Sequence, residues 1–150
     1  MTVRPLRKAD LDRVSVLERA TFADPWSRRS LAESLRQTYV RGLALENAEG
    51  LLVAYGLAAV VGPEGEILNL AVEAGCRGQG LGRLLLDGLV AALREEGVTT
   101  VFLEVRRSNE PAVALYRSAG FQPQGVRPGY YASPREDALT MALELGSQSA

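Results

Sequence analysis

The sequence predicts a mixed α/β fold, in which a single sheet carries helices on both of its faces. Short apolar stretches of strand length alternate with longer stretches whose apolar residues recur at helical spacing. Residues 47–50 (NAEG) form a hairpin signal between two strand-like stretches. Later in the chain, two strand-then-helix units follow each other, which favours a sheet with both strand directions. Because the chain has 150 residues, we expect one domain over residues 1–150.

The expected elements follow the order β-α-α-β-β-β-α-β-α-β-β. The first helix has Asp10 as its expected cap, and the second begins after Ser27, a favoured capping residue. The long third helix ends at Gly97, and the short fourth helix ends at Gly120. The expected strands cover residues 2–6, 40–46, 51–60, 66–72, 99–105, 121–127 and 138–145. The expected helices cover residues 8–20, 24–37, 80–96 and 109–120, and about 146–150 form a frayed tail.

The composition excludes several kinds of site. The chain has no histidine and one cysteine, so Ser-His-Asp triads, Cys-His pairs, histidine or thiolate metal sites and intramolecular disulfides are ruled out. We therefore expect no metal, and a general base that is Asp or Glu, or less often Tyr, Lys or a chain of waters. The net charge of −1 argues against direct nucleic-acid binding. Short apolar runs and a polar N-terminus predict a cytoplasmic protein with no membrane contact.

A glycine-rich loop lies between the third meander strand and the long helix. Glycine allows positive φ angles and close approach of a ligand, and a helix N-terminus offers free N–H groups and partial positive charge. The flanking arginines add full charges. These features predict a phosphate-binding loop, and the alternative is a plain glycine-rich turn. The loop residues are Arg77, Gly78, Gln79, Gly80, Leu81, Gly82 and Arg83.

Three phosphate ligands compete for this loop. A nucleotide-binding P-loop ends in Gly-Lys-Ser/Thr, whereas this loop ends in Gly82-Arg83-Leu84. A dinucleotide fingerprint needs G-x-G-x-x-G, and Arg83 occupies the place of the third glycine, although Glu104 lies about twenty residues on, where a ribose-binding acid belongs. The third ligand is the pyrophosphate of coenzyme A.

Two stretches carry a resemblance to a known family. The arrangement Arg77-x-x-Gly80-x-Gly82 resembles the Q/R-x-x-G-x-G/A motif of the GNAT acyltransferases, and the order of elements is similar over nearly the whole chain. Residues 102–121 (FLEVRRSNEPAVALYRSAGF) closely resemble the RimI branch, which acetylates the N-terminal alanine of a small-subunit ribosomal protein. Residues 22–27 (FADPWS) and 125–143 (GVRPGYYASPREDALTMAL) are similar to that branch as well, with departures at Pro128 and Ala132.

The resemblance implies the GNAT fold with a splayed central sheet, acetyl-CoA as co-substrate and a peptide N-terminus as acceptor. It implies Glu104 as general base and Tyr116 as general acid. The residues that it places on acetyl-CoA are Leu70, Ala71, Val72, the loop residues 78–83 and Asn109. Pantetheine is expected between the splayed strands, with the peptide entering from the other side. Phe22 and Trp26 are expected to form one wall of the peptide site, and Tyr130 and Tyr131 the other.

Each of these residues also has a purely structural interpretation. Glu104 can be a half-exposed strand residue in a salt bridge, and Tyr116 a core tyrosine. Asn109 can be a helix cap, alone or as well as a ligand. Phe22 and Trp26 can form a hydrophobic plug, and Tyr130 and Tyr131 can serve packing or an interface.

The expected reaction is acetyl transfer to a protein α-amine, which loses its proton far more readily than lysine does. Deprotonating a lysine at neutral pH costs roughly 3.5 kcal/mol more, because the two pKa values differ by about 2.6 units. An acetyltransferase for lysine or a small-molecule amine is the alternative within enzymes, and a non-catalytic acetyl-CoA sensor is the alternative outside them. The sequence leaves the oligomeric state open.

Overall fold

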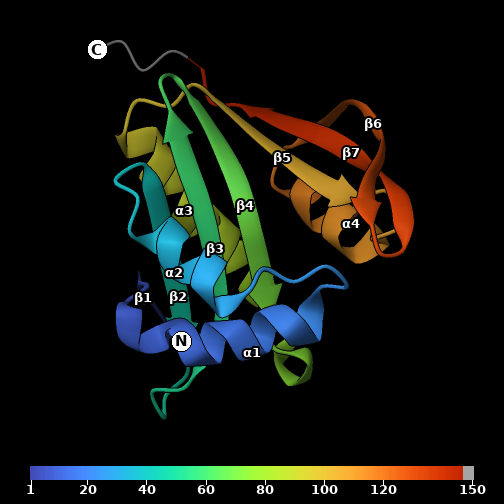
Figure 1. The fold of residues 1–150 in the computed structure, drawn as a ribbon. Coiled ribbons are helices and arrows are strands. Elements are labelled where there is room, and N and C mark those ends of the chain that lie inside the picture. Colours follow the sequence, from blue (N-terminus) through green and yellow to red (C-terminus); the bar gives the residue numbers. More distant parts are fainter. Residues whose placement is uncertain (147–150) are drawn as a thin grey trace.

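The computed structural model describes residues 1–146 (Figure 1). Apart from Gly146, the predicted tail lies outside the described residues. The strands are β1 (Thr2–Pro5), β2 (Val40–Glu46), β3 (Leu52–Val61), β4 (Glu64–Val72), β5 (Thr100–Arg106), β6 (Gln122–Ala132) and β7 (Arg135–Glu144). The helices are α1 (Leu11–Thr21), α2 (Arg28–Leu35), α3 (Leu81–Glu95) and α4 (Glu110–Ser118), and short 3₁₀ turns cover Lys8–Asp10 and Ala74–Cys76.

The strands form one mixed sheet in the order β1-β2-β3-β4-β5-β7-β6, in which β4 and β5 are parallel and all other neighbours are antiparallel. The predicted order of elements and the mixed sheet are confirmed. The last two strands are longer than predicted: β6 continues past residue 127, through an irregular register between Arg127 and Tyr131, to Ala132. The two tyrosines therefore belong to a strand rather than to a loop.

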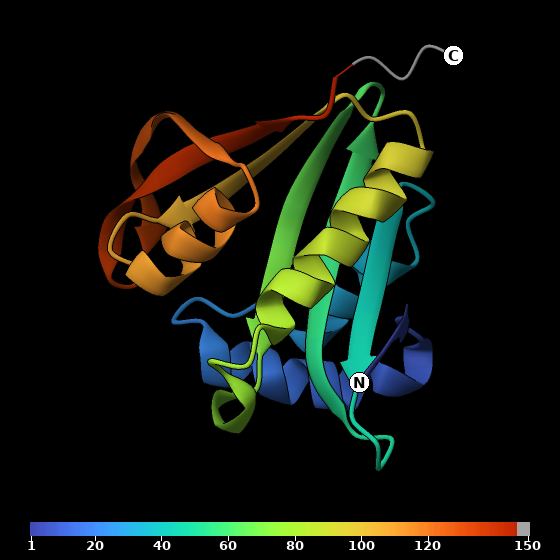
Figure 2. The ribbon, with the colours of Figure 1, turned by 180° about the vertical axis from the view of Figure 1, so that it is seen from behind.

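Helices cover both faces of the sheet, as predicted. Helices α1 and α2 lie on one face (Figure 1), and α3 and α4 lie on the other (Figure 2). On the first face, Leu11, Val14 and Leu31 pack against Tyr55 of β3. The second face has the larger core, in which α3 packs over β2, β3 and β4 and α4 lies beside β5 and β7 (Figure 2). Its buried residues include Leu86, Leu89, Leu93, Leu103, Val105, Tyr116 and Met141.

The sheet forks between β4 and β5. Their pairing runs from Glu64 with Thr100 to Ile67 with Leu103 and then stops. At the same place the register of β4 against β3 shifts, so that Leu68 is an extra residue on β4. A bulge of this kind bends its strand and ends regular pairing. Beyond it β4 pairs with β3 alone and β5 with β7 alone, and Figure 1 shows the two arms diverging. The predicted splay is therefore confirmed.

The two predicted helix caps have different outcomes. The Ser27 hydroxyl accepts a hydrogen bond from the N–H of Ser30 and caps α2 as predicted. The Asp10 carboxylate instead accepts from the N–H of Arg7, 2.8 Å away, and pairs with Arg4 at 2.8 Å. The Arg4 hydrogen bond holds the pKa of Asp10 below its ordinary value. Because the 3₁₀ turn precedes α1, this carboxylate fixes the entry to the helix and does not cap it.

Candidate active site

A cleft with a volume of about 820 Å³ opens in the fork of the sheet. Its walls come from the α1–α2 loop, the outer part of β4, the glycine loop, β5, α4 and the β6–β7 turn. All residues predicted for the site line this cleft except Gln79 and Tyr130. Those that line it are Phe22, Trp26, Leu70, Ala71, Val72, Arg77, Gly78, Gly80, Leu81, Gly82, Arg83, Glu104, Asn109, Tyr116 and Tyr131.

The glycine loop has the backbone that a phosphate site requires. Gly78 and Gly80 have φ angles of +79° and +77°, a region that favours glycine. Gly80 is the N-cap of α3, so the free N–H groups of the first helical turn begin at the cleft. A Cβ on Gly82 would lie 3.2 Å from the Leu115 side chain, so glycine also lets α3 approach α4. Gln79 is exposed and its side chain does not line the cleft, so its contact with acetyl-CoA stays a prediction.

The two loop arginines differ in how far their charge is balanced. Arg83 pairs with Asp87 at 2.9 Å and donates to the Ser118 carbonyl at 2.8 Å, which links α3 to the end of α4. Arg77 donates to the Val72 carbonyl at 3.1 Å, and within residues 1–146 no carboxylate lies within ion-pair distance of it. Arg77 therefore contributes the less compensated positive charge at the cleft.

Glu104 is both in a salt bridge and open to the cleft. Its Oε1 lies 3.2 Å from Arg127 Nη1, whereas its Oε2 is buried and has no hydrogen-bond partner among the described residues. The side chain is 17% exposed. Glu66 lies nearby on β4, and burial, followed by the negative charge of Glu104, raises the pKa of Glu66. The structural alternative for Glu104 thus accounts for one of its oxygens and leaves the other available to a ligand.

Tyr116 is a core residue that also reaches the cleft. It is 8% exposed and packs edge-on against Phe121, with ring centroids 5.8 Å apart. Burial raises the pKa of Tyr116 well above its ordinary value, so its hydroxyl stays protonated at neutral pH. Asn109 also combines a structural role with a place at the cleft. Its side-chain oxygen accepts a hydrogen bond from the N–H of Ala112 at 3.3 Å and caps α4, and the residue lines the cleft.

Glu104 and Tyr116 approach the cleft from opposite faces of the sheet. Alternate residues of β5 point to opposite faces, and Leu103 belongs to the core beneath α3 and α4 together with Tyr116. Glu104 therefore points toward the α1 and α2 face. The fork lets a ligand on one face react with a ligand on the other. The glycine loop leads into α3, which lies on the same face of the sheet as α4, the helix that carries Tyr116 (Figure 2).

The α1–α2 loop and the β6–β7 turn meet over the cleft on the Glu104 side. Arg106 joins them: it pairs with Asp24 at 2.8 Å, with Glu136 at 3.3 Å, and lies 4.4 Å from the ring centre of Tyr131. Burial raises the pKa of Tyr131 to about 12. Tyr130 is 52% exposed and does not line the cleft itself, but its ring packs edge-on against Tyr131, with the ring centroids 5.1 Å apart, so its role in the peptide wall stays a prediction.

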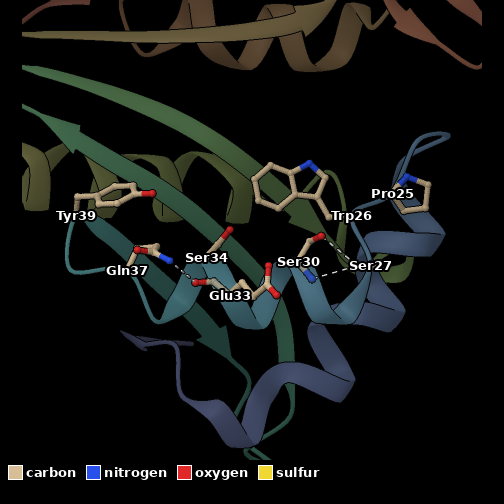
Figure 3. A pocket seen from close by; sticks show the side chains of 8 residues that line it. All are labelled: Pro25, Trp26, Ser27, Ser30, Glu33, Ser34, Gln37 and Tyr39. Atoms are coloured by element: carbon tan, nitrogen blue, oxygen red, sulfur yellow. Dashed lines mark hydrogen bonds between the residues drawn. The ribbon is translucent and has the colours of Figure 1, made fainter.

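A second hollow, of about 540 Å³, lies beside the cleft along α2 (Figure 3). Figure 3 shows Tyr39 at one end and Pro25 at the other, with Trp26 and Ser34 between them and Ser30 of α2 beside Trp26. Trp26 lines both the hollow and the cleft. Its indole also packs against the core beneath α1 and α2, so both interpretations of Trp26 stay open.

Sequence reasoning missed several polar residues of the cleft. Glu18 shares the apolar face of α1 with Leu11 and Val14, and Asn69 interrupts the apolar run of β4. A polar residue on an otherwise apolar face is the sequence pattern that could have identified Glu18 and Asn69 as candidate site residues. Asp24 and Arg106 had no such signal, because their ion pair joins residues far apart in the chain.

Two further properties concern residues 1–146 as a whole. No helix there is long and apolar enough to cross a bilayer. The described part of the chain also brings together no group of three His, Cys, Asp or Glu side chains suited to a metal ion.

Comparison with known proteins gives consistent results. Residues 11–121 match the model of the acetyltransferase (GNAT) family. The chain is 38% identical to the [ribosomal protein bS18]-alanine N-acetyltransferase of Escherichia coli K12, over 96% of this chain and 97% of that one. It is also 38% identical to the putative enzyme of that name from Bacillus subtilis 168, over 93% of this chain and 92% of that one.

The crystal structure of the E. coli ribosomal-protein-S18-alanine N-acetyltransferase superposes with a TM-score of 0.90. That match has 35% identity and covers 99% of this chain and 96% of the other. This chain therefore belongs to the acetyltransferase (GNAT) family, in the branch that includes these bacterial enzymes.

Proposed function

We propose that this protein transfers the acetyl group of acetyl-CoA to the α-amine of a polypeptide that begins with alanine, in a small-subunit ribosomal protein of the bS18 kind. The observation that carries the proposal is the fork of the sheet: the glycine loop, the free Oε2 of Glu104 and Tyr116 all line one cleft. The relatives that share the fold over nearly the whole chain are named for this reaction. A ribosomal target makes the cytoplasm the place of action.

The fork supports separate binding of the two substrates. Past Ile67, the edge of β4 that faces β5 has backbone groups without a strand partner, which suits the amide-bearing arm of acetyl-CoA. The pyrophosphate suits the free N–H groups at the start of α3 and the charge of Arg77. The polypeptide then enters from the α1 and α2 face, between Trp26 and Tyr131.

The residues divide the proton transfers between them. Glu104 Oε2 accepts a proton from the α-ammonium, which frees the nitrogen lone pair. The nitrogen then forms a bond to the acetyl carbon, the carbon–sulfur bond breaks, and Tyr116 donates its proton to the leaving sulfur. The second proton lost by the nitrogen restores the Tyr116 hydroxyl through solvent. The products are the acetylated N-terminus and coenzyme A with a free thiol, and one proton is released overall.

A peptide panel tests this function. The purified protein is incubated with acetyl-CoA and short peptides that differ in the first residue, together with an N-terminally blocked peptide that carries one lysine. Mass spectrometry locates the acetyl group. We expect acetylation of free alanine N-termini. Acetylation of the blocked lysine peptide alone would overturn the N-terminal assignment, and bound acetyl-CoA without any product would point to a small-molecule substrate or a sensor.

A further inference from the structure

A buried carboxylate lies behind the cleft on α1. Glu18 is 1% exposed, and both of its oxygens are occupied. Its Oε1 accepts from the Tyr55 hydroxyl and from Asn69 Nδ2, the latter at 2.8 Å, and its Oε2 accepts from the N–H of Trp26 at 2.8 Å. Burial raises the pKa of Tyr55, which keeps this donor protonated. The network joins α1 to β3, β4 and the α1–α2 loop.

This network fixes which way the Asn69 amide points. Asn69 is 6% exposed, and its Oδ1 is buried without a hydrogen-bond partner among the described residues. A carboxylate accepts hydrogen bonds and does not donate them, so the amide must present its NH₂ group to Glu18. A flipped amide would place two oxygens against each other. The carbonyl oxygen therefore points away from Glu18, and Asn69 lines the cleft.

An unpartnered acceptor at this depth is unusual. A buried carbonyl oxygen without a partner is destabilising, and most such groups in proteins are satisfied. Glu18 prevents the amide from turning to relieve this cost. A hydrogen-bond donor that enters the cleft therefore meets an acceptor that is already oriented and has no competing partner in residues 1–146.

Asn69 and Glu104 lie on the two arms of the fork and face the same side of the sheet. Asn69 is two residues beyond Ile67, and Glu104 is one residue beyond Leu103, which pairs with Ile67. The Asn69 side chain contacts Glu18 of α1. Glu104 shares its face of β5 with Arg106, which reaches the α1–α2 loop. Both residues line the same cleft, and each has one buried oxygen without a hydrogen-bond partner among residues 1–146.

The attacking amine needs two such acceptors. A neutral primary amine has one lone pair and two N–H bonds, and in the attack the lone pair must face the acetyl carbon. One N–H is then directed to the Glu104 carboxyl group, and a second fixed acceptor for the other N–H would hold the lone pair toward the acetyl carbon. Resting on the proposed function, we propose that Asn69 is a substrate-binding residue whose Oδ1 accepts the second N–H of the α-amine. Glu18 is the positioning residue that holds Asn69 in this orientation.

Steady-state kinetics of Asn69→Leu test the proposal. Leucine has nearly the shape of asparagine and lacks the acceptor. We expect kcat/KM for the alanine peptide to fall about tenfold or more, the loss of one hydrogen bond to a group that becomes charged. The KM for acetyl-CoA should stay unchanged, since that substrate binds on the other face. Tyr55→Phe is the matched control, because it removes one donor to Glu18 outside the cleft. It should keep kcat/KM within about threefold.

A modified peptide substrate distinguishes an Asn69 that binds the amine from an Asn69 that only supports the fold. A peptide that begins with N-methylalanine has one N–H fewer. We expect N-methylation to slow the wild type several times more than it slows Asn69→Leu, because the variant has already lost the acceptor. Equal effects on the two proteins, or a wild-type kcat/KM in Asn69→Leu, would overturn the proposal. An equal loss of acetyl-CoA affinity in Asn69→Leu would also overturn it, since it would indicate a damaged cleft.

Two further measurements keep the test decisive. If Asn69→Leu is poorly folded by its melting temperature, Asn69→Ser replaces it, because its hydroxyl can donate to Glu18 but is too short to serve both partners. The same kinetic outcomes then apply. Failure of the proposed function is visible separately, since the wild type itself would then leave the alanine peptide unmodified.

Discussion

Arg127 on β6 holds one oxygen of Glu104 on β5, with Nη1 3.2 Å from Oε1, and leaves Oε2 free in the cleft. We expect Arg127→Gln to lower kcat/KM by about two- to fivefold, because the arginine is 61% exposed and such pairs contribute up to about 1 kcal/mol. The loss should shrink in high salt, where the pair is already screened. Kinetics at two salt concentrations measure it, and a loss as large as that of Glu104→Gln would mean that Arg127 acts in the chemistry itself.

The glycine loop offers a matched pair of substitutions. Gly80 and Gly50 have φ angles of +77° and +79°, and a Cβ on either would meet open space. Gly80→Ala and Gly50→Ala should therefore lose similar stability, about 1 kcal/mol each, because alanine disfavours this region. Gly80→Ala alone should raise the KM for acetyl-CoA, since Gly50 lies in a distant hairpin turn. Thermal melts and kinetics check this, and an equal KM for both variants would contradict a phosphate role for the loop.

The Tyr116 hydroxyl can be removed with its ring contacts kept. Tyr116→Phe retains the edge-on packing against Phe121. We expect kcat to fall about a hundredfold or more, as is typical when a general acid is lost. Calorimetric binding of acetyl-CoA and the melting temperature should change little. A variant with the wild-type kcat would leave Tyr116 as a core residue and would assign the thiol proton to solvent.

Buried tyrosines predict a loss of stability in alkali. Burial raises the pKa values of Tyr55 and Tyr116, and that of Tyr131 to about 12. The unfolded chain loses these protons near pH 10, before the folded protein does, so folding stability is full below pH 10 and falls as pH rises above it. Denaturant unfolding at pH 8, 10 and 11 measures how steeply the free energy of unfolding falls with pH. Tyr55→Phe should flatten this dependence, and an unchanged slope in that variant would contradict the assignment.

The fold followed from local patterns, whereas much of the cleft did not. Apolar periodicity and turn residues predicted the elements, and the Ser27 cap is confirmed because capping depends on neighbours in the chain. Glu18 and Asn69 meet across 51 positions of sequence, so no local pattern encodes their hydrogen bond. The irregular register before Tyr131 carried β6 past its predicted end.

Single-turnover transfer by the wild type and by Glu104→Gln tests the central claim most directly. Each protein is loaded with acetyl-CoA, mixed with an alanine peptide, and the acetylated peptide is measured by mass spectrometry over time. We predict equal acetyl-CoA affinity and a transfer rate at least about a hundredfold lower in Glu104→Gln, because glutamine cannot accept the ammonium proton. Equal transfer rates in the two proteins would contradict the account, and would show that Glu104 is held by Arg127 for structure alone.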